Sequence, residues 1–158
     1  MFLLHFLPFL GFHPTIRMIR CVLIVNDSGK PRLVRFYDES SFDEQQVVIK
    51  EAFSAVSGKE TGVVSGCCFV SSSTKYKTIF RHFASLYFIV IANECESELG
   101  ILDLLQVFVH VLDKCFDNIC ELDIVYRYER VNYVLDEIIM GGMVLETNTD
   151  VIMSAISG

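Results

Sequence analysis

The chain has no tryptophan, only three prolines, and few basic residues for its size. Thirteen lysines and arginines stand against 20 aspartates and glutamates, a formal net charge of −7. This charge repels phosphates and anionic lipids, which argues against nucleic-acid binding and against direct docking on a membrane surface. No apolar run reaches the ~18 to 20 residues that span a bilayer. The most apolar stretch ends at Asn93-Glu94 and is interrupted upstream by Arg81-His82.

Motifs that carry chemistry are also missing. "DSGKPR" resembles the end of a phosphate-binding loop, but Ile24 replaces the required glycine and Pro31 the required serine or threonine. No G-x-S-x-G surrounds Ser71. The six cysteines form no C-x-x-C and have no histidine at zinc spacing; they are Cys21, Cys67, Cys68, Cys95, Cys115 and Cys120. We therefore expect no enzyme, no catalytic residues, no metal site and no cofactor.

The 158 residues are 52% hydrophobic, which is enough for one domain with a large core. Residues 1–17 form an apolar leader without the basic start and the small-residue cleavage site of a secretory signal. We interpret them as an N-terminal extension that is disordered or absent from the native protein, ahead of a start at Met18. Residues 18–158 then make a single domain.

The first half of this domain has the pattern of strands around one helix. Two β-branched runs, 21–26 and 33–37, flank the turn signal Asp27-Ser28-Gly29 and predict a hairpin. Ser41 and Glu44 form a capping box that opens a helix, which Gly58 ends. Three further strands are predicted at 66–73, 76–84 and 85–92. Leu86 to Ile91 is apolar on both faces, which is typical of a central strand.

The second half is helical. Glu98 to Phe116 predicts a helix buried on most sides, because its polar residues form a narrow stripe of Asp103, Gln106, His110, Asp113 and Asp117. A second helix is predicted over Leu122 to Met140 and ends at Gly141-Gly142, and Thr147 or Asn148 could cap a short final helix. The order β-β-α-β-β-β-α-α predicts an α+β fold, with a five-stranded antiparallel sheet packed with helices.

"IFRHFASLYF", residues 79–88, closely resembles the signature of the clathrin-adaptor small chains, the sigma subunits of heterotetrameric adaptor complexes. The family usually has tyrosine where this chain has Phe80 and Phe83. The resemblance covers about residues 18 to 155 and continues through "GKPRLVRFY", "ESELGILDLLQVFV", "LDKCF", "CELDI" and "MGGMVLETN". "ESELGILDL" and "MGGMVLETN" are most similar to the sigma subunit of adaptor complex 3.

The resemblance implies a longin-like fold and a non-enzymatic cytoplasmic coat subunit in intracellular protein transport. It implies a delta-type large adaptin as the direct partner, which the chain stabilises, with beta and mu adaptins in the same complex. It also implies a peripheral location on Golgi, endosomal and vesicle membranes, reached only through the assembled complex. The alternatives are the sigma subunit of another adaptor complex, or another longin-type module such as a SNARE regulatory domain or a tether subunit.

Relatives in the family bind acidic dileucine sorting signals, [DE]-x-x-x-L-[LI], in cargo tails. Matched position by position, Arg32 would be the cation for the signal's acidic residue. The apolar groove for the two leucines would be Ala84, Leu86, Val109, Ile119, Leu122 and Ile124. Taken without the family, the apolar residues could equally be core residues, and Arg32 a solvated charge of a hairpin.

Overall fold

The computed structural model describes residues 19–57, 67–72 and 75–158 of the chain. Within these ranges, five antiparallel strands form the main sheet in the spatial order β2-β1-β5-β4-β3. They are β1 (Ile19–Asn26), β2 (Pro31–Phe36), β3 (Cys67–Ser72), β4 (Tyr76–Phe83) and β5 (Leu86–Asn93). The N-terminal extension, the helix stop at Gly58 and the ends of the predicted strand 66–73 lie outside the described residues.

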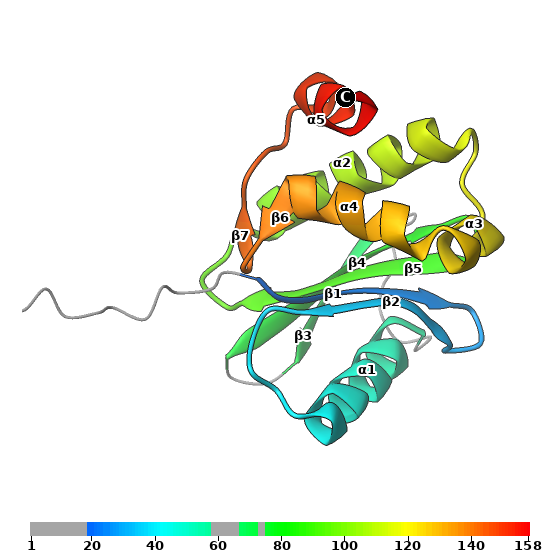
Figure 1. The fold of residues 1–158 in the computed structure, drawn as a ribbon. Coiled ribbons are helices and arrows are strands. Elements are labelled where there is room, and N and C mark those ends of the chain that lie inside the picture. The colour runs from blue at the N-terminus through cyan, green and yellow to red at the C-terminus, as the bar shows by residue number, and fades with distance from the viewer. Residues whose placement is uncertain (1–18, 58–66, 73–74) are drawn as a thin grey trace, which may run out of the picture.

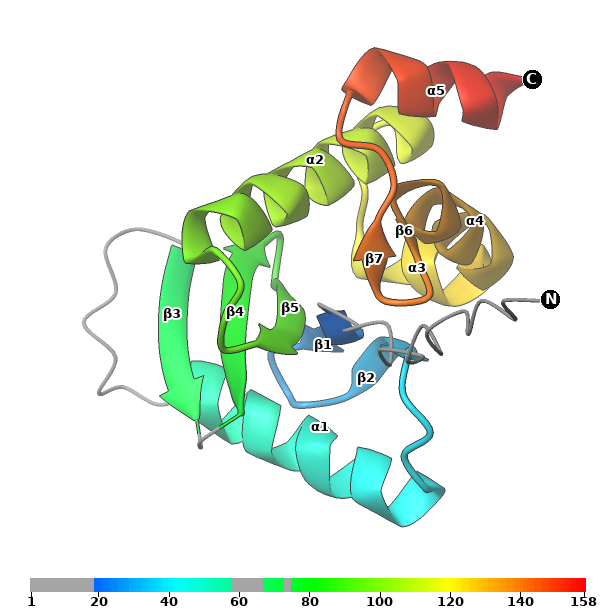
Figure 2. The same cartoon turned by 90° about the vertical axis from the view of Figure 1, so that its left-hand side faces the viewer.

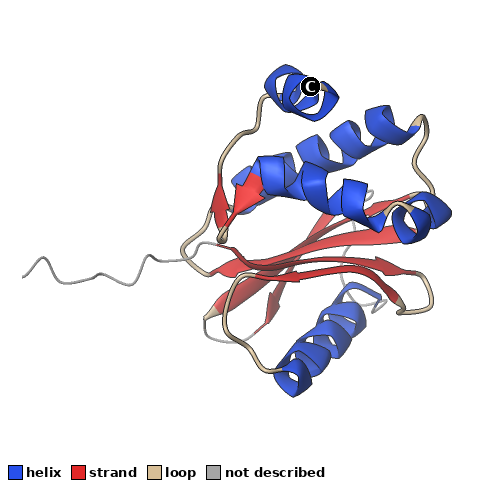
Figure 3. Cartoon of the chain, viewed as in Figure 1, coloured by secondary structure: helices blue, strands red, loops and turns tan. Residues whose placement is uncertain are grey.

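The helices lie on both faces of this sheet (Figures 1 and 3). They are α1 (Phe42–Ser57), α2 (Glu98–Phe116), α3 (Glu121–Tyr126), α4 (Tyr128–Ile138) and α5 (Thr149–Ser157). Helix α1 covers one face, whereas α2, α3 and α4 cover the other. Helix α5 packs on the outside of α2 and α4 (Figure 2). The predicted α+β class is confirmed, and so are the bounds of α2.

The two central strands are apolar on both sides because each side faces a helical layer. In β1, Leu23 belongs to the core cluster on the α1 side, with Ile49 of that helix. Its neighbour Val22 belongs to the larger cluster on the other side, with Leu105 of α2. The polar stripe predicted for α2 is exposed at Asp103, Gln106 and His110. Alternate residues of the central strands therefore face opposite helical layers, and the apolar residues of α2 face the sheet. The result is a core of three layers, with the sheet between α1 on one side and α2, α3 and α4 on the other.

The turn between β1 and β2 is built on Asn26 and Gly29. The Asn26 side-chain oxygen accepts hydrogen bonds from the backbone N–H groups of Ser28 (3.0 Å) and Lys30 (2.8 Å). Gly29 has φ +83°, and a Cβ added there would lie 2.9 Å from the ring of Phe53 in α1. Glycine is thus required both by the backbone conformation and by the close approach of the ring.

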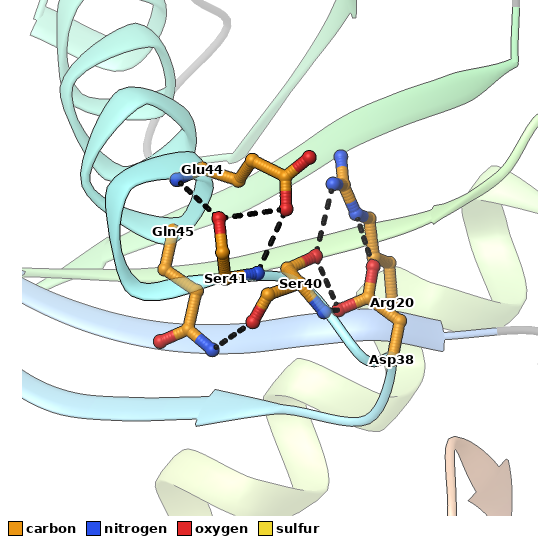
Figure 4. Close-up of polar contacts among 6 residues, drawn as sticks. All are labelled: Arg20, Asp38, Ser40, Ser41, Glu44 and Gln45. Atoms are coloured by element: carbon orange, nitrogen blue, oxygen red, sulfur yellow. Dashed lines mark hydrogen bonds and ion pairs between the residues drawn. The ribbon is translucent and has the colours of Figure 1, made fainter.

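The predicted capping box at the start of α1 is present (Figure 4). The Glu44 carboxylate accepts from the backbone N–H of Ser41 (2.7 Å), and the Glu44 N–H donates to the Ser41 hydroxyl (3.3 Å). Arg20 in β1 binds Asp38 at 2.7 Å and also donates to Ser40. These bonds fix the segment between β2 and α1 against the sheet.

The prediction of one helix over Leu122 to Met140 is wrong in two respects. The first is a break at Arg127, whose backbone (φ −120°, ψ 40°) is not helical, so that α3 and α4 are separate helices. Ile124 and Val131, seven residues apart, are both fully buried on either side of the break. The apolar spacing of a single helix therefore continues across it, and the sequence pattern gives no signal for the break.

The second difference is a small hairpin after α4. Ile139–Met140 (β6) pairs with Met143–Val144 (β7), so the helix ends at Ile138. Gly141 and Gly142 have φ +60° and +86° and form the two-residue turn between these strands. Two successive positive φ values favour this hairpin turn over a simple helix stop. The predicted short final helix is α5, and Asn148 is its N-cap.

Candidate functional site

The predicted cation, Arg32 on β2, is already paired within the chain. Its Nε and Nη2 atoms each lie 2.7 Å from Oε1 of Glu121, the first residue of α3. The same oxygen accepts a hydrogen bond from the Asn26 side chain at 2.9 Å. The contact joins residues 89 apart in sequence and ties α3 to the edge strand of the sheet.

The surroundings of this pair keep Glu121 ionised. The hydrogen bonds from Asn26 and Arg32, with the nearby charge of Lys30, hold the pKa of the Glu121 carboxyl below its ordinary value. The side chains of Arg32 and Glu121 remain 26% and 29% exposed. The pair is therefore an accessible surface ion pair, and an incoming carboxylate would meet an arginine whose charge is already neutralised.

Four of the six apolar candidates lie in the core. Leu86 and Ile124 are fully buried, and Val109 and Ile119 are each 3% exposed. All four belong to the cluster between the sheet and helices α2 to α5. They form packed interior in this structure, so leucine side chains could reach them only if the elements above them moved.

The other two apolar candidates are at the surface. Leu122, in α3, is 61% exposed. Ala84 is exposed in the two-residue turn between β4 and β5, where Ala84 and Ser85 have φ +47° and +65°. This left-handed conformation is costly for residues other than glycine, and such strain is concentrated at functional positions of proteins.

The elements that carry Arg32, Leu86 and Leu122, which are β2, β5 and α3, meet at one end of the sheet (Figure 1). Leu86, the first residue of β5, pairs in register with Asn26, the last residue of β1. Asn26 in turn bonds to Glu121, which precedes Leu122 in α3. Helix α3 packs beside β2, which carries Arg32. Segments that are far apart in sequence thus place the cation and the exposed leucine on the same edge.

A hollow elsewhere on the surface is not this site. It measures about 500 Å³ and is lined by Arg35, Tyr128, Glu129, Asn132, Tyr133 and Asp136. Arg35 donates to Asp136 at 2.7 Å and to Asn132 at 2.6 Å, so it fastens β2 to α4. None of the seven candidate residues lines this hollow.

Sequence reasoning missed Glu121, which contacts the predicted cation directly, and Asn26, which donates a hydrogen bond to Glu121. The Arg32–Glu121 pair spans most of the domain, and one sequence contains no signal for such a long-range pair. Asn26 lies in the hairpin turn, and its role in the turn already explains an asparagine at this position. The sequence therefore gives no reason to expect its second bond, to Glu121 of α3. Only the packing of α3 against β2 brings these groups together.

An α+β domain with a basic edge strand and a short helix across it is consistent with the expected class. Residues 18–158 match the family described as "Clathrin adaptor complex small chain", and the chain belongs to this family. Small chains of adaptor complexes are structural trafficking subunits and not enzymes, so the expectation of a non-enzymatic protein is confirmed by the family.

Several of the similar curated proteins are sigma subunits. The chain is 47% identical over 142 residues to human "AP-3 complex subunit sigma-2", an alignment that covers 88% of this chain and 73% of that protein. It is 45% identical over 141 residues to the AP-3 complex subunit sigma of Dictyostelium discoideum, covering 87% and 82% of the two chains. It is 41% identical over 143 residues to that of Arabidopsis thaliana, covering 88% and 84%.

A comparison with solved structures gives the same result as the sequence comparisons. A chain of the structure titled "Homology model of the full-length AP-3 complex in a stretched open conformation" superposes with a TM-score of 0.66 and 33% identity, covering 89% of this chain and 92% of that one. The sequence resemblance to sigma subunits is thus confirmed. Among the residues with described coordinates, no helix has the length and apolar character to cross a membrane.

Proposed function

We propose that the chain is the small subunit of an AP-3 adaptor complex and that it stabilises a delta-type large adaptin, alongside beta and mu adaptins. It would act on Golgi, endosomal and vesicle membranes as part of the assembled complex. The main support is the 47% identity to a curated AP-3 sigma subunit over 88% of the chain.

Exposed apolar side chains support a partner-bound role. Large hydrophobic residues on the described surface are strongly exposed, and groups of this kind often mark protein interfaces. The most exposed are Tyr126 at 80%, Leu99 at 75%, Phe42 at 73%, Leu122 at 61% and Met140 at 61%. A large subunit wrapped around the chain would remove many of these side chains from water.

We further propose that the chain contributes to the binding of acidic dileucine signals in cargo tails. Arg32 would face the acidic residue, and Leu122 and Ala84 would form the exposed part of the leucine site. Leu86, Val109, Ile119 and Ile124 would form its floor, reached when α3 moves away from the sheet edge. Burial of two leucines contributes ~1.5–3 kcal/mol each, against ~0.2–1 kcal/mol for an exposed ion pair.

The test uses the assembled complex and fluorescent peptides. Saturable binding of a Glu-x-x-x-Leu-Leu peptide, measured by anisotropy and lost when both leucines become alanine, is expected. Arg32→Ser should weaken binding at low salt only modestly, by less than about two-fold, because Glu121 already pairs with Arg32 in the wild type. A complex that assembles but binds the Leu-Leu and Ala-Ala peptides equally would contradict the signal-binding role and leave the subunit assignment intact.

A further inference from the structure

We propose that Glu121 is a specificity-determining residue of the signal site, because its carboxylate competes with the signal's acidic residue for Arg32. The inference rests on the proposed dileucine-binding function. Its consequence is that the chain selects a signal by its leucines and only weakly by its acidic residue. The geometry that carries it is one carboxylate oxygen, Oε1 of Glu121, lying 2.7 Å from both Nε and Nη2 of Arg32.

Competition follows from what an incoming carboxylate must displace. To take the Nε and Nη2 positions of Arg32 it has to expel Glu121 Oε1, so charge-assisted hydrogen bonds are lost as similar ones form. The carboxylate of Glu121 is held in place by its position in α3 and by the hydrogen bond from Asn26. The carboxylate of the peptide, in contrast, must be ordered on binding. The exchange therefore makes the acidic residue of the signal contribute little to the free energy of binding.

A neutral residue at position 121 would change this balance. Glu121→Gln keeps the length of the side chain and an oxygen that can accept from Asn26, but it removes the charge that neutralises Arg32. Glutamine is also a good helix former, so α3 is expected to remain. Arg32 would then be available to the peptide, and the acidic residue would contribute as an ordinary exposed ion pair.

The experiment measures a ratio of affinities in the assembled complex. Two peptides, Glu-x-x-x-Leu-Leu and Gln-x-x-x-Leu-Leu, are titrated against the wild-type and Glu121→Gln complexes at low salt. The wild type is expected to prefer the acidic peptide by less than about 1.5-fold, and the variant by roughly two- to five-fold. The gain should disappear in the Glu121→Gln/Arg32→Gln double variant, since Arg32 is its cause.

Glu129→Gln is the matched control, because it removes one negative charge from an exposed residue of α4. It should keep the wild-type ratio. If Glu121→Gln behaves like this control, or if the double variant keeps the gain, the competition is overturned while dileucine binding stands. If neither complex prefers Leu-Leu over Ala-Ala peptides, the proposed function itself fails.

If the variant does not assemble, the ratio of the wild-type complex's affinities for the acidic and the neutral peptide still tests the competition. A wild-type complex that prefers the acidic peptide five-fold or more has an Arg32 that Glu121 does not block, which overturns the inference. A wild-type ratio near one, together with loss of binding to Ala-Ala peptides, supports it.

Discussion

Two substitutions at the candidate site, Leu122→Ser and Val109→Ser, should differ in their effect on the stability of the domain. Leu122 is 61% exposed and Val109 is 3% exposed. Exposed substitutions usually change the free energy of unfolding by less than ~0.5 kcal/mol. Val109→Ser removes two buried methyl groups at ~0.8 kcal/mol each and buries a hydroxyl at ~1–3 kcal/mol, which predicts a loss of about 2.6–4.6 kcal/mol.

The assay is hydrogen–deuterium exchange of the assembled complex, together with peptide binding. In Val109→Ser, backbone amides of α2 that exchange by unfolding of the domain should exchange about 80-fold faster or more, since 1.36 kcal/mol is about a factor of ten. In Leu122→Ser, α2 protection should be unchanged, but the Leu-Leu peptide should bind more weakly. Normal peptide binding by an assembled Leu122→Ser complex would remove this residue from the site. Unchanged α2 protection in Val109→Ser would refute the burial argument.

Three further predictions concern the stability and burial of Ser41, Asp38 and Cys21, which lie outside the candidate site. Ser41→Ala removes the capping hydroxyl and should destabilise α1 by ~1 kcal/mol, seen as faster exchange of its first turns; no change would contradict the capping role. Burial raises the pKa of Asp38, but hydrogen bonds from Ser40 and Arg20 outweigh it and hold this pKa below its ordinary value. The stabilisation by Asp38 is therefore present above the unfolded pKa of ~3.9 and lost as pH falls through the folded pKa. Asp38→Asn should make the free energy of unfolding depend less on pH in this acid range. An unchanged pH dependence would contradict the stabilising role of Asp38. Burial also raises the pKa of the Cys21 thiol, so iodoacetamide should modify exposed Cys95 and spare Cys21 until denaturant is added; early labelling of Cys21 would contradict its burial.

The sequence predicted most of the fold because its elements follow local rules. The capping box at Ser41 and Glu44 predicted the start of α1. The two-sided apolar character of β5 predicted a central strand, and it pairs with both β1 and β4. Period, caps and turn residues are properties of neighbouring positions, so they can be read from one chain.

What the sequence did not predict depends on tertiary packing. The break at Arg127 interrupts an apolar pattern that continues unchanged across it. The contact of Glu121 with Arg32 joins residues 89 positions apart. Burial of Leu86 and exposure of Leu122 also depend on tertiary packing, because the residue type is leucine at both positions. The family resemblance identified the candidate residues, but it could not tell which of them the chain itself covers.

The central claim is that this chain is a small subunit of an AP-3 adaptor complex, and co-purification tests it most directly. The tagged protein would be purified from its native cells, and the stoichiometric chains would be identified by mass spectrometry. The account predicts delta, beta and mu adaptins in equal amounts with the tagged chain. Recovery of the adaptins of another complex would contradict the AP-3 assignment, and recovery of no adaptin would contradict the coat function altogether.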